Sequence, residues 1–236
     1  MNQKFRLIAA VLAFSLLSAG GVQAASASVE AADLADPATL TQIDVEMQKW
    51  DIEEATRENL LAKYAAGEVW DSMNDSEPVS VEERQDGETQ ITTSRYKDGS
   101  VSVSTLERPE AEQKGTISPL KVAGCRVSSS NGVTDYTGCW ASESSILISA
   151  GFTVNYSTHQ TGGAWIRSTG SYSITILSLG AGYSNLTLAV TKKYATSSAP
   201  ATAELTFRPT GMTFATTCRL KVSITTGGSI STNAWF

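Results

Sequence analysis

The stretch ILISAGFTVNYS, residues 146–157, decides the fold that the sequence predicts. Large apolar side chains alternate through it with small or polar ones, and this period of two is typical of a strand with one buried face. Such a strand must bury its apolar face against another layer of structure. The residues of that face are Ile146, Ile148, Ala150, Phe152, Val154 and Tyr156.

The same alternation returns in shorter runs further along the chain, separated by clusters of Gly, Ser, Asn and Pro. Several short strands with no helical period between them favour an antiparallel sandwich or barrel, solvated on a Ser- and Thr-rich face. We therefore predict a β-sandwich domain over residues 116–236. The apolar positions of these runs are Tyr172, Ile174 and Ile176; Leu186, Leu188 and Val190; Ala203, Leu205 and Phe207; and Cys218, Leu220, Val222 and Ile224.

A hairpin closed by two cysteines is expected at the start of this domain. The turn signal Asn131-Gly132 lies midway between Cys125 and Cys139. A two-residue turn would place Cys125 opposite Gly138, whereas a three-residue loop would place the two cysteines face to face. We therefore predict a Cys125–Cys139 disulfide and an odd-numbered loop. Closing a loop of about 15 residues is worth roughly 3 kcal/mol.

The third cysteine, Cys218, shares the apolar face of its run, so we expect a free thiol that acts as a small core residue. Pairing of Cys218 with Cys125 or with Cys139 is the alternative, because the count of 3 cysteines is odd. The cysteines and the single histidine lack ligand spacing, so a zinc site is not predicted.

Residues 25–107 predict an acidic helical leader that contains a β-hairpin. Asp36-Pro37 is a helix start, an N-cap followed by proline at the first helical position. Apolar stripes of helical spacing follow, the second over residues 52–66, so two helices should pack as a helical hairpin. Asp98-Gly99 predicts the turn of a β-hairpin over residues 89–106. Its strands are polar on both faces, so it needs support from the helices or from the other domain.

Two connecting segments complete the predicted organisation. Residues 74–88 are acidic and predict a loop, and residues 108–115, charged and with one proline, predict a linker. The predicted fold class is therefore mainly β: an antiparallel β-sandwich preceded by a small α+β segment, the helical hairpin plus the β-hairpin.

Residues 1–24 have the pattern of a secretory signal peptide. Lys4 and Arg6 precede an apolar run, residues 7–18, and small residues then place the cleavage after Ala24. Twelve apolar residues cover about 18 Å, which is too short for a hydrocarbon core of about 30 Å. We therefore expect a secreted, extracellular protein whose cysteines meet an oxidising environment.

Charge divides the chain at the same place as the strand pattern. Of the 24 acidic residues, 21 lie between Ala25 and Lys114, which gives this part an excess of 13 negative charges. Residues 115–236 carry an excess of 5 positive charges. Opposite charge of this kind predicts that the two parts dock electrostatically.

The sequence contains no recognisable catalytic motif. His159 lies in a loop-like segment, and no GxSxG sequence accompanies it. Asp135, Glu143 and Glu204 are the carboxylates of the sandwich domain, and they are too dispersed to predict a glycosidase pair. No cofactor or metal is expected. We therefore predict a non-enzymatic protein, with a hydrolase assembled from isolated residues as an alternative.

Four aromatic residues in or beside expected loops form the candidate binding surface. Exposed rings on a rigid sheet stack on sugars and anchor interfaces, so the expected partner is a cell-wall polymer, a carbohydrate or another surface protein. Nucleic acid is not expected, because basic and aromatic residues do not interleave. A membrane-active β protein, a pore former or barrel, is the alternative from another class. The four residues are Trp140, Trp165, Tyr172 and Tyr183.

Several segments resemble uncharacterised secreted proteins of actinobacterial type, which combine an acidic helical leader with a disulfide-closed β domain. The resemblance implies the signal peptide, the paired Cys125 and Cys139 and the β domain. It implies no activity and no site residues. The segments are DGSV (98–101), CRVSSSNGVTDYTGC (125–139), SAGFTVNY (149–156), APATAELTF (199–207) and CRLKVSI (218–224).

Overall fold

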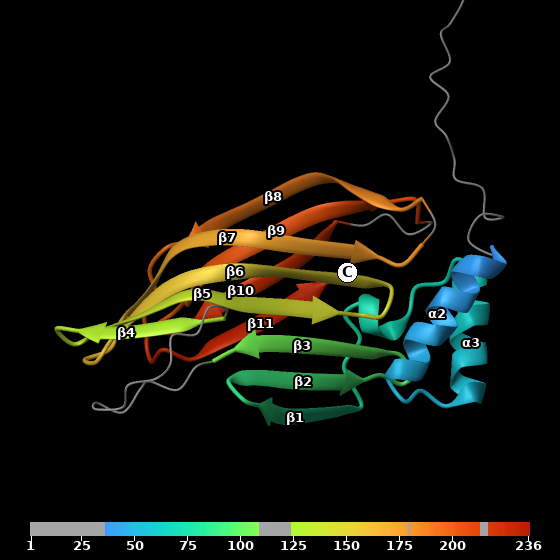
Figure 1. Ribbon diagram of the computed structural model, residues 1–236, viewed down its shortest axis with the longest axis horizontal. Helices are drawn as coiled ribbons and strands as arrows, with labels where there is room; N and C mark the ends of the chain where they lie inside the picture. Colours follow the sequence, from blue (N-terminus) through green and yellow to red (C-terminus); the bar gives the residue numbers. More distant parts are fainter. Residues whose placement is uncertain (1–35, 109–123, 179, 213–216) are drawn as a thin grey trace, which may run out of the picture.

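The computed structural model describes residues 36–108, 124–178, 180–212 and 217–236. Within these ranges the chain forms an elongated, two-layered antiparallel sandwich with a pair of helices at one end (Figure 1). The helices are α2 (Pro37–Lys49), α3 (Glu54–Ala65) and the short 3-10 helix η1 (Asp71–Met73).

Two sheets make up the sandwich, and the predicted mainly β fold class is confirmed. The first sheet has the strand order β1-β2-β3-β5-β6-β7, with β4 also paired to β5, and the second has the order β11-β10-β9-β8. The strands are β1 (Ser80–Asp86), β2 (Thr89–Arg95), β3 (Val101–Glu107), β4 (Arg126–Ser130), β5 (Val133–Ser144), β6 (Ile148–His159), β7 (Ala164–Ile176), β8 (Gly182–Lys192), β9 (Ala201–Thr210), β10 (Cys218–Ile224) and β11 (Ile230–Trp235).

The core lies between β6 of the first sheet and β9 and β10 of the second. The alternating residues from Ile148 to Tyr156 are buried on β6, as the period of two predicts, and those from Ala203 to Phe207 are buried on β9. Cys218 is buried with a free thiol, and burial raises its pKa to about 12. Ile146 is buried as well, but it lies in the turn before β6, with φ of 70°, and not on the strand.

The helix start predicted at Asp36-Pro37 is confirmed. The Asp36 side chain accepts a hydrogen bond from the Thr39 N–H (2.9 Å), and Pro37 is the first residue of α2. Trp70, which is fully buried, closes the small core of this end by donating from Nε1 to the Leu60 carbonyl (3.0 Å). The apolar faces of α2 and α3 pack against each other and against Trp70. Short helices need such packing, because neither would be stable alone.

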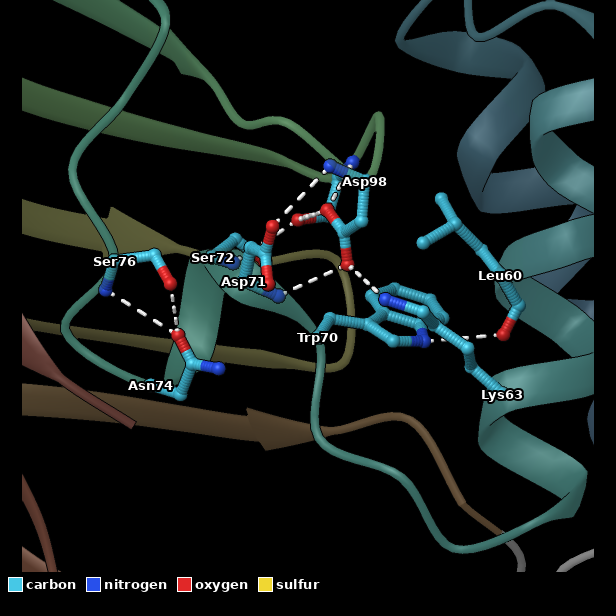
Figure 2. A network of polar contacts seen from close by, with 9 residues as sticks. Leu60, Lys63, Trp70, Asp71, Ser72, Asn74, Ser76 and Asp98 are labelled. Atoms are coloured by element: carbon cyan, nitrogen blue, oxygen red, sulfur yellow. Dashed lines mark hydrogen bonds and ion pairs between the residues drawn. The ribbon is translucent and has the colours of Figure 1, made fainter.

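Asp98 connects the helical end to the β2–β3 turn (Figure 2). Its carboxylate accepts hydrogen bonds from Lys63 Nζ (3.0 Å), from the Asp71 N–H (3.0 Å), and from both the N–H (2.9 Å) and the hydroxyl (2.6 Å) of Ser100. Burial on its own raises the Asp98 pKa, but these hydrogen bonds outweigh it, so the pKa lies below its ordinary value.

The loop predicted over residues 74–88 is wrong in part, because Ser80–Asp86 form β1 and pair with β2. Every residue of β1 is exposed, so the strand has no apolar alternation that would reveal it in the sequence. The acidic segment therefore widens the first sheet by one edge strand.

The β2–β3 hairpin is supported as predicted, since β3 pairs with β5 from Val103 opposite Ser144 to Leu106 opposite Ala141. The compositional boundary of the chain is thus crossed by one continuous sheet. Residues 109–115 of the expected linker, and residues 1–24 of the expected signal peptide, lie outside the described residues.

Strand pairing, and not ion pairing, joins the two oppositely charged parts within the described residues, and their electrostatic docking stays a prediction. No ion pair joins described residues of 36–108 to described residues of 124–236. The contacts are the β3–β5 ladder and polar bonds such as the one from the Trp140 N–H to Glu107 Oε2 (2.8 Å). Hydrogen bonds between the antiparallel strands β3 and β5 thus hold the two parts together.

The Cys125–Cys139 disulfide is confirmed, but the odd-numbered loop is wrong. Ser130 pairs with Val133, so Asn131-Gly132 is a two-residue turn, with positive φ at both positions. A two-residue turn alone would leave Cys125 opposite Gly138, one position short of Cys139. A β-bulge makes up this difference, because Thr137 and Gly138 together lie opposite one residue of β6. Gly138, with φ of 73°, turns the chain so that Cys139 reaches Cys125, with 4.1 Å between their Cα atoms.

Candidate ligand-binding groove

The four aromatic residues proposed as a binding surface do not share one face. Trp140 and Trp165 lie on the outer face of the first sheet, on rows about 13 Å apart along β6. Trp140 covers the backbone of Gly151, where an added Cβ would lie 2.4 Å from the Trp140 ring. Tyr172 and Tyr183 instead lie on β7 and β8, at the open side between the sheets.

Tyr172 and Tyr183 act together as a seal at that open side. The hydrogen bond with the Tyr172 side chain raises the pKa of Tyr183 above its ordinary value. The Tyr183 ring packs edge-on against the buried Phe207, with 6.2 Å between ring centroids. With 43% and 42% of their surfaces exposed, the two tyrosines cover the core while their outer edges face solvent.

The three carboxylates of the sandwich part lie on separate surfaces. Asp135 is on the outer face of the first sheet, 3.6 Å from Arg167, and Glu204 is on the outer face of the second, 3.6 Å from Arg219. Glu143 points to the inside of the sandwich, on the same side of β5 as the buried Cys139 and Ala141. No two of these three carboxylates meet at one substrate.

Among the described residues, the single histidine is not part of a catalytic chain. His159 Nδ1 lies 2.7 Å from the Thr161 hydroxyl of its own turn, while the Ser157 hydroxyl donates to Asp135, so no Ser–His–Asp chain forms. Within the same ranges, no three His, Cys, Asp or Glu side chains are grouped to hold a metal. No helix of the described ranges is long and apolar enough to cross a bilayer.

A groove follows from the unequal width of the two sheets. The first sheet continues through β3, β2 and β1 beyond the second, whose outermost strand on this side is β11. The inner face of β1–β3 is therefore the floor of the groove and the edge of β11 is its wall. A cavity of about 360 Å³ lies between them, lined by residues of β1, β2, β3, β5 and β11.

Hollows continue along the whole length of β11. One of about 150 Å³ shares Arg108 with the main cavity, and one of about 220 Å³ shares Tyr96 with it. A fourth, of about 310 Å³, extends past Met73 to the end of the chain at Phe236. Every residue of 228–236 lines at least one of them, and we call this connected trough the β11 groove.

A row of directly opposed residues crosses the floor of the β11 groove. Glu83 on β1 is opposite Thr92, Thr92 is opposite Ser104, and Ser104 is opposite Glu143 on β5. Three strand spacings separate the two glutamates, so their Cα atoms are about 14 Å apart. Gln90 Nε2 donates to Glu83 (3.2 Å) and holds it over the floor.

Glu143 is the enclosed end of this row. Burial raises its pKa to about 7, and hydrogen bonds from Ser104 and Ser102 only partly offset that effect. The Ser104 hydroxyl also bonds Thr232 of β11, and the Ser102 hydroxyl lies 3.3 Å from that of Tyr96. The Glu143 carboxyl is therefore connected to floor and wall alike, and its charge changes near neutral pH.

The β11 groove is acidic. Its connected hollows contain four carboxylates and one guanidinium, and no other charged side chain of the described residues lines them. A groove with this balance favours positively charged groups. The charged residues are Asp71, Asp75, Glu83, Glu143 and Arg108.

Replacing Glu143 by glutamine is expected to remove a pH dependence of stability. The folded pKa of about 7 exceeds the ordinary value of 4.5, so the contribution of Glu143 is fully present below about pH 4.5 and is lost as pH rises through 7. The free energy of unfolding of the parent protein should therefore fall by about 2 kcal/mol from pH 4.5 to pH 8, after allowance for solvent in the groove. Urea titrations at several pH values should show that the free energy of unfolding of Glu143→Gln depends less on pH than that of the parent protein. A profile unchanged from that of the parent would refute this account, and Glu83→Gln is the matched control.

Sequence reasoning missed both glutamates of the floor. The sequence holds one signal for Glu143. It follows Cys139 and Ala141 at every second position, so the alternation of the strand places this charged residue on the inward face. For Glu83 no such signal exists, since β1 is exposed throughout. The groove itself depends on which strands are neighbours, and the sequence of β11 does not contain that information.

Fold and groove together define a class: an antiparallel two-sheet protein with an acidic groove beside an edge strand. No family model and no curated protein sequence matches the chain. A solved structure with some similarity is that of hypothetical protein lmo2686 from Listeria monocytogenes EGD-e, which is 16% identical, with a TM-score of 0.33. The match covers 64% of this chain and 98% of that chain.

Proposed function

We propose that the protein is an exported, non-enzymatic binding module that holds a cationic extracellular partner in the β11 groove. The observation that carries the proposal is the charge of the groove, four carboxylates against one guanidinium along a continuous trough. The Cys125–Cys139 disulfide suits the oxidising compartment that residues 1–24 predict.

The construction of the groove suits binding without large rearrangement. Its floor is the inner face of a hydrogen-bonded sheet, so the hydroxyl and carboxyl groups of the Glu83–Glu143 row are already in position. A preorganised site reduces the entropy that a partner loses with it on binding. Hydroxyl and amide groups, among them Ser94, Gln90 and Asn233, supply hydrogen bonds between the charged points.

The proposal is tested with octalysine as the probe, by calorimetry at about 10 mM and about 150 mM salt. We expect binding at low salt that weakens at high salt. The double variant Glu83→Gln/Glu143→Gln should lose about tenfold in affinity, which is about 1.4 kcal/mol for two partly screened charge pairs. Glu82→Gln, on the opposite face of the same strand, is the matched control and should stay within about twofold. No binding at low salt, or an equal loss in the control, would show the proposal to be wrong.

Binding of a carbohydrate or of cell wall at a different surface is tested separately. Trp140 and Trp165 share one outer face, and stacking there would not involve the groove. Retention on purified cell wall that is lost in Trp140→Ala/Trp165→Ala, but kept in Glu83→Gln/Glu143→Gln, would assign binding to that face. That result alone would not contradict our proposal. The proposal would be wrong only if octalysine also failed to bind the groove.

A further inference from the structure

The backbone of β11 alternates between its neighbour β10 and the groove. In the turn between them, the Thr225 N–H donates to the Ser229 carbonyl (2.9 Å). Hydrogen-bonded pairs in an antiparallel ladder alternate, so the backbone groups of Ser231 and Asn233 face β10. Those of Ile230, Thr232 and Ala234 therefore face the groove, and Arg108 does donate to the Ile230 carbonyl there.

Most of this strand edge is free within the described residues. No described strand pairs with β11 on the groove side. No described residue bonds the backbone N–H or C=O of Thr232 or Ala234 on that side. Unpaired strand edges are templates for another strand, and proteins usually cover or disrupt them. Here no described segment covers the edge at Thr232 and Ala234, and it lies beside a walled hollow instead of on a flat surface.

We propose that the occupant of the β11 groove is an extended peptide segment of a partner protein, which adds to the second sheet as a strand beside β11 and places a Lys or Arg side chain over the Glu83–Glu143 row. This inference rests on the proposed function and specifies its ligand. The 6 residues of β11 extend over about 20 Å, enough for a peptide of about six residues. Main-chain bonds would supply affinity, and the acidic floor would select the side chains.

Charge also argues against a second copy of this chain as the occupant. Of the edge strands that a second copy would offer, β1 is the one exposed at every residue, and its sequence SVEERQD carries three acidic residues and one basic residue. Its excess negative charge would face the carboxylates of the groove. A basic peptide from another protein has the opposite and favourable sign.

The test uses the peptide Thr-Lys-Thr-Lys-Thr-Lys-Thr-Lys with blocked ends and two N-methylated isomers, methylated either at all Lys or at all Thr residues. In an extended chain the N–H groups of alternate residues point to the same edge, so only one isomer blocks pairing with β11. We expect one isomer to lose at least about tenfold in affinity and the other to stay within about threefold. Equal affinities of the two isomers, whether retained or lost, would overturn strand pairing. Octalysine binding that depends on Glu83 and Glu143 would still leave the proposed function standing.

A variant of the protein supplies the second arm. Ala234→Pro removes an N–H that faces the groove, a position where edge strands accept proline, whereas Ala234→Gly keeps the N–H and is the control. Affinity for the unmodified peptide should fall about tenfold in Ala234→Pro only, with thermal melting checked for both. Unchanged affinity in a folded Ala234→Pro variant would overturn the inference. So would sedimentation that shows concentration-dependent dimers without peptide, because a second copy would then fill the groove.

Discussion

Asp98→Ala is expected to lower the free energy of unfolding by about 3 kcal/mol, because it removes the buried partner of a partly buried charge pair and leaves several donors without an acceptor. The carboxylate is 7% exposed and accepts bonds from Lys63, from the backbone of Asp71 and from Ser100. These three groups belong to α3, η1 and the β2–β3 turn (Figure 2), so the loss should loosen the contact between helices and sheet. Urea denaturation at pH 7, compared with that of the parent protein, measures it.

The pH dependence of the same variant distinguishes charge from packing. The pKa of Asp98 is lowered in the fold, so its contribution is present above about pH 4 and is lost as pH falls through the folded value. The parent protein and Asp98→Ala should therefore converge in stability in acid. Asp86→Ala, an exposed aspartate at the end of β1, is the control and should change stability by less than about 0.5 kcal/mol. A difference that stays constant down to pH 2 would show that packing, and not the ionised carboxylate, is responsible.

Removal of the disulfide in Cys125→Ser/Cys139→Ser is expected to cost about 3 kcal/mol, since the bond closes a loop of 14 residue steps in the unfolded chain. The hairpin that it closes pairs through β5 with both β3 and β6, so a weaker hairpin affects the centre of the first sheet. Denaturation with and without dithiothreitol measures the effect. Reductant should destabilise the parent protein and leave the double variant unchanged.

Cys218→Ala is the control for that experiment. Cys218 is buried and free, so its replacement should leave the response to reductant intact and cost only the contacts of one sulfur atom. If reductant had no effect on the parent protein, or if alkylation of the native protein labelled two thiols, the assignment of the disulfide would be wrong.

Local patterns predicted the parts of the fold that are determined locally. The alternation over β6, the Asp36-Pro37 helix start and the Asp98-Gly99 turn each depend on a few neighbouring residues, and all three are observed. The cysteine pair was also found, although its geometry depends on a bulge at Gly138 that simple register counting leaves out.

The groove is not local in this sense. It arises because β3 pairs with β5 and because β11 ends the second sheet, and both facts join residues far apart in the chain. Glu143 looks like an isolated acid until Ser104, 39 positions earlier, is placed opposite it. β1 shows most clearly what sequence periodicity cannot predict, because a strand with both faces in water carries no periodic signal.

The β3–β5 ladder has a consequence for the order in which the molecule assembles. β1, β2 and β3 precede β5, the partner of β3, in the chain. Until β5 is available, the first three strands can form only an incomplete sheet. An incomplete sheet with open edges is prone to aggregate. The charged and hydroxyl-bearing side chains of β1 and β2 act as gatekeepers during that interval, since a segment of low hydrophobicity and high charge resists self-association. We therefore expect the charge of β1 to limit self-association of the incomplete sheet before the groove exists.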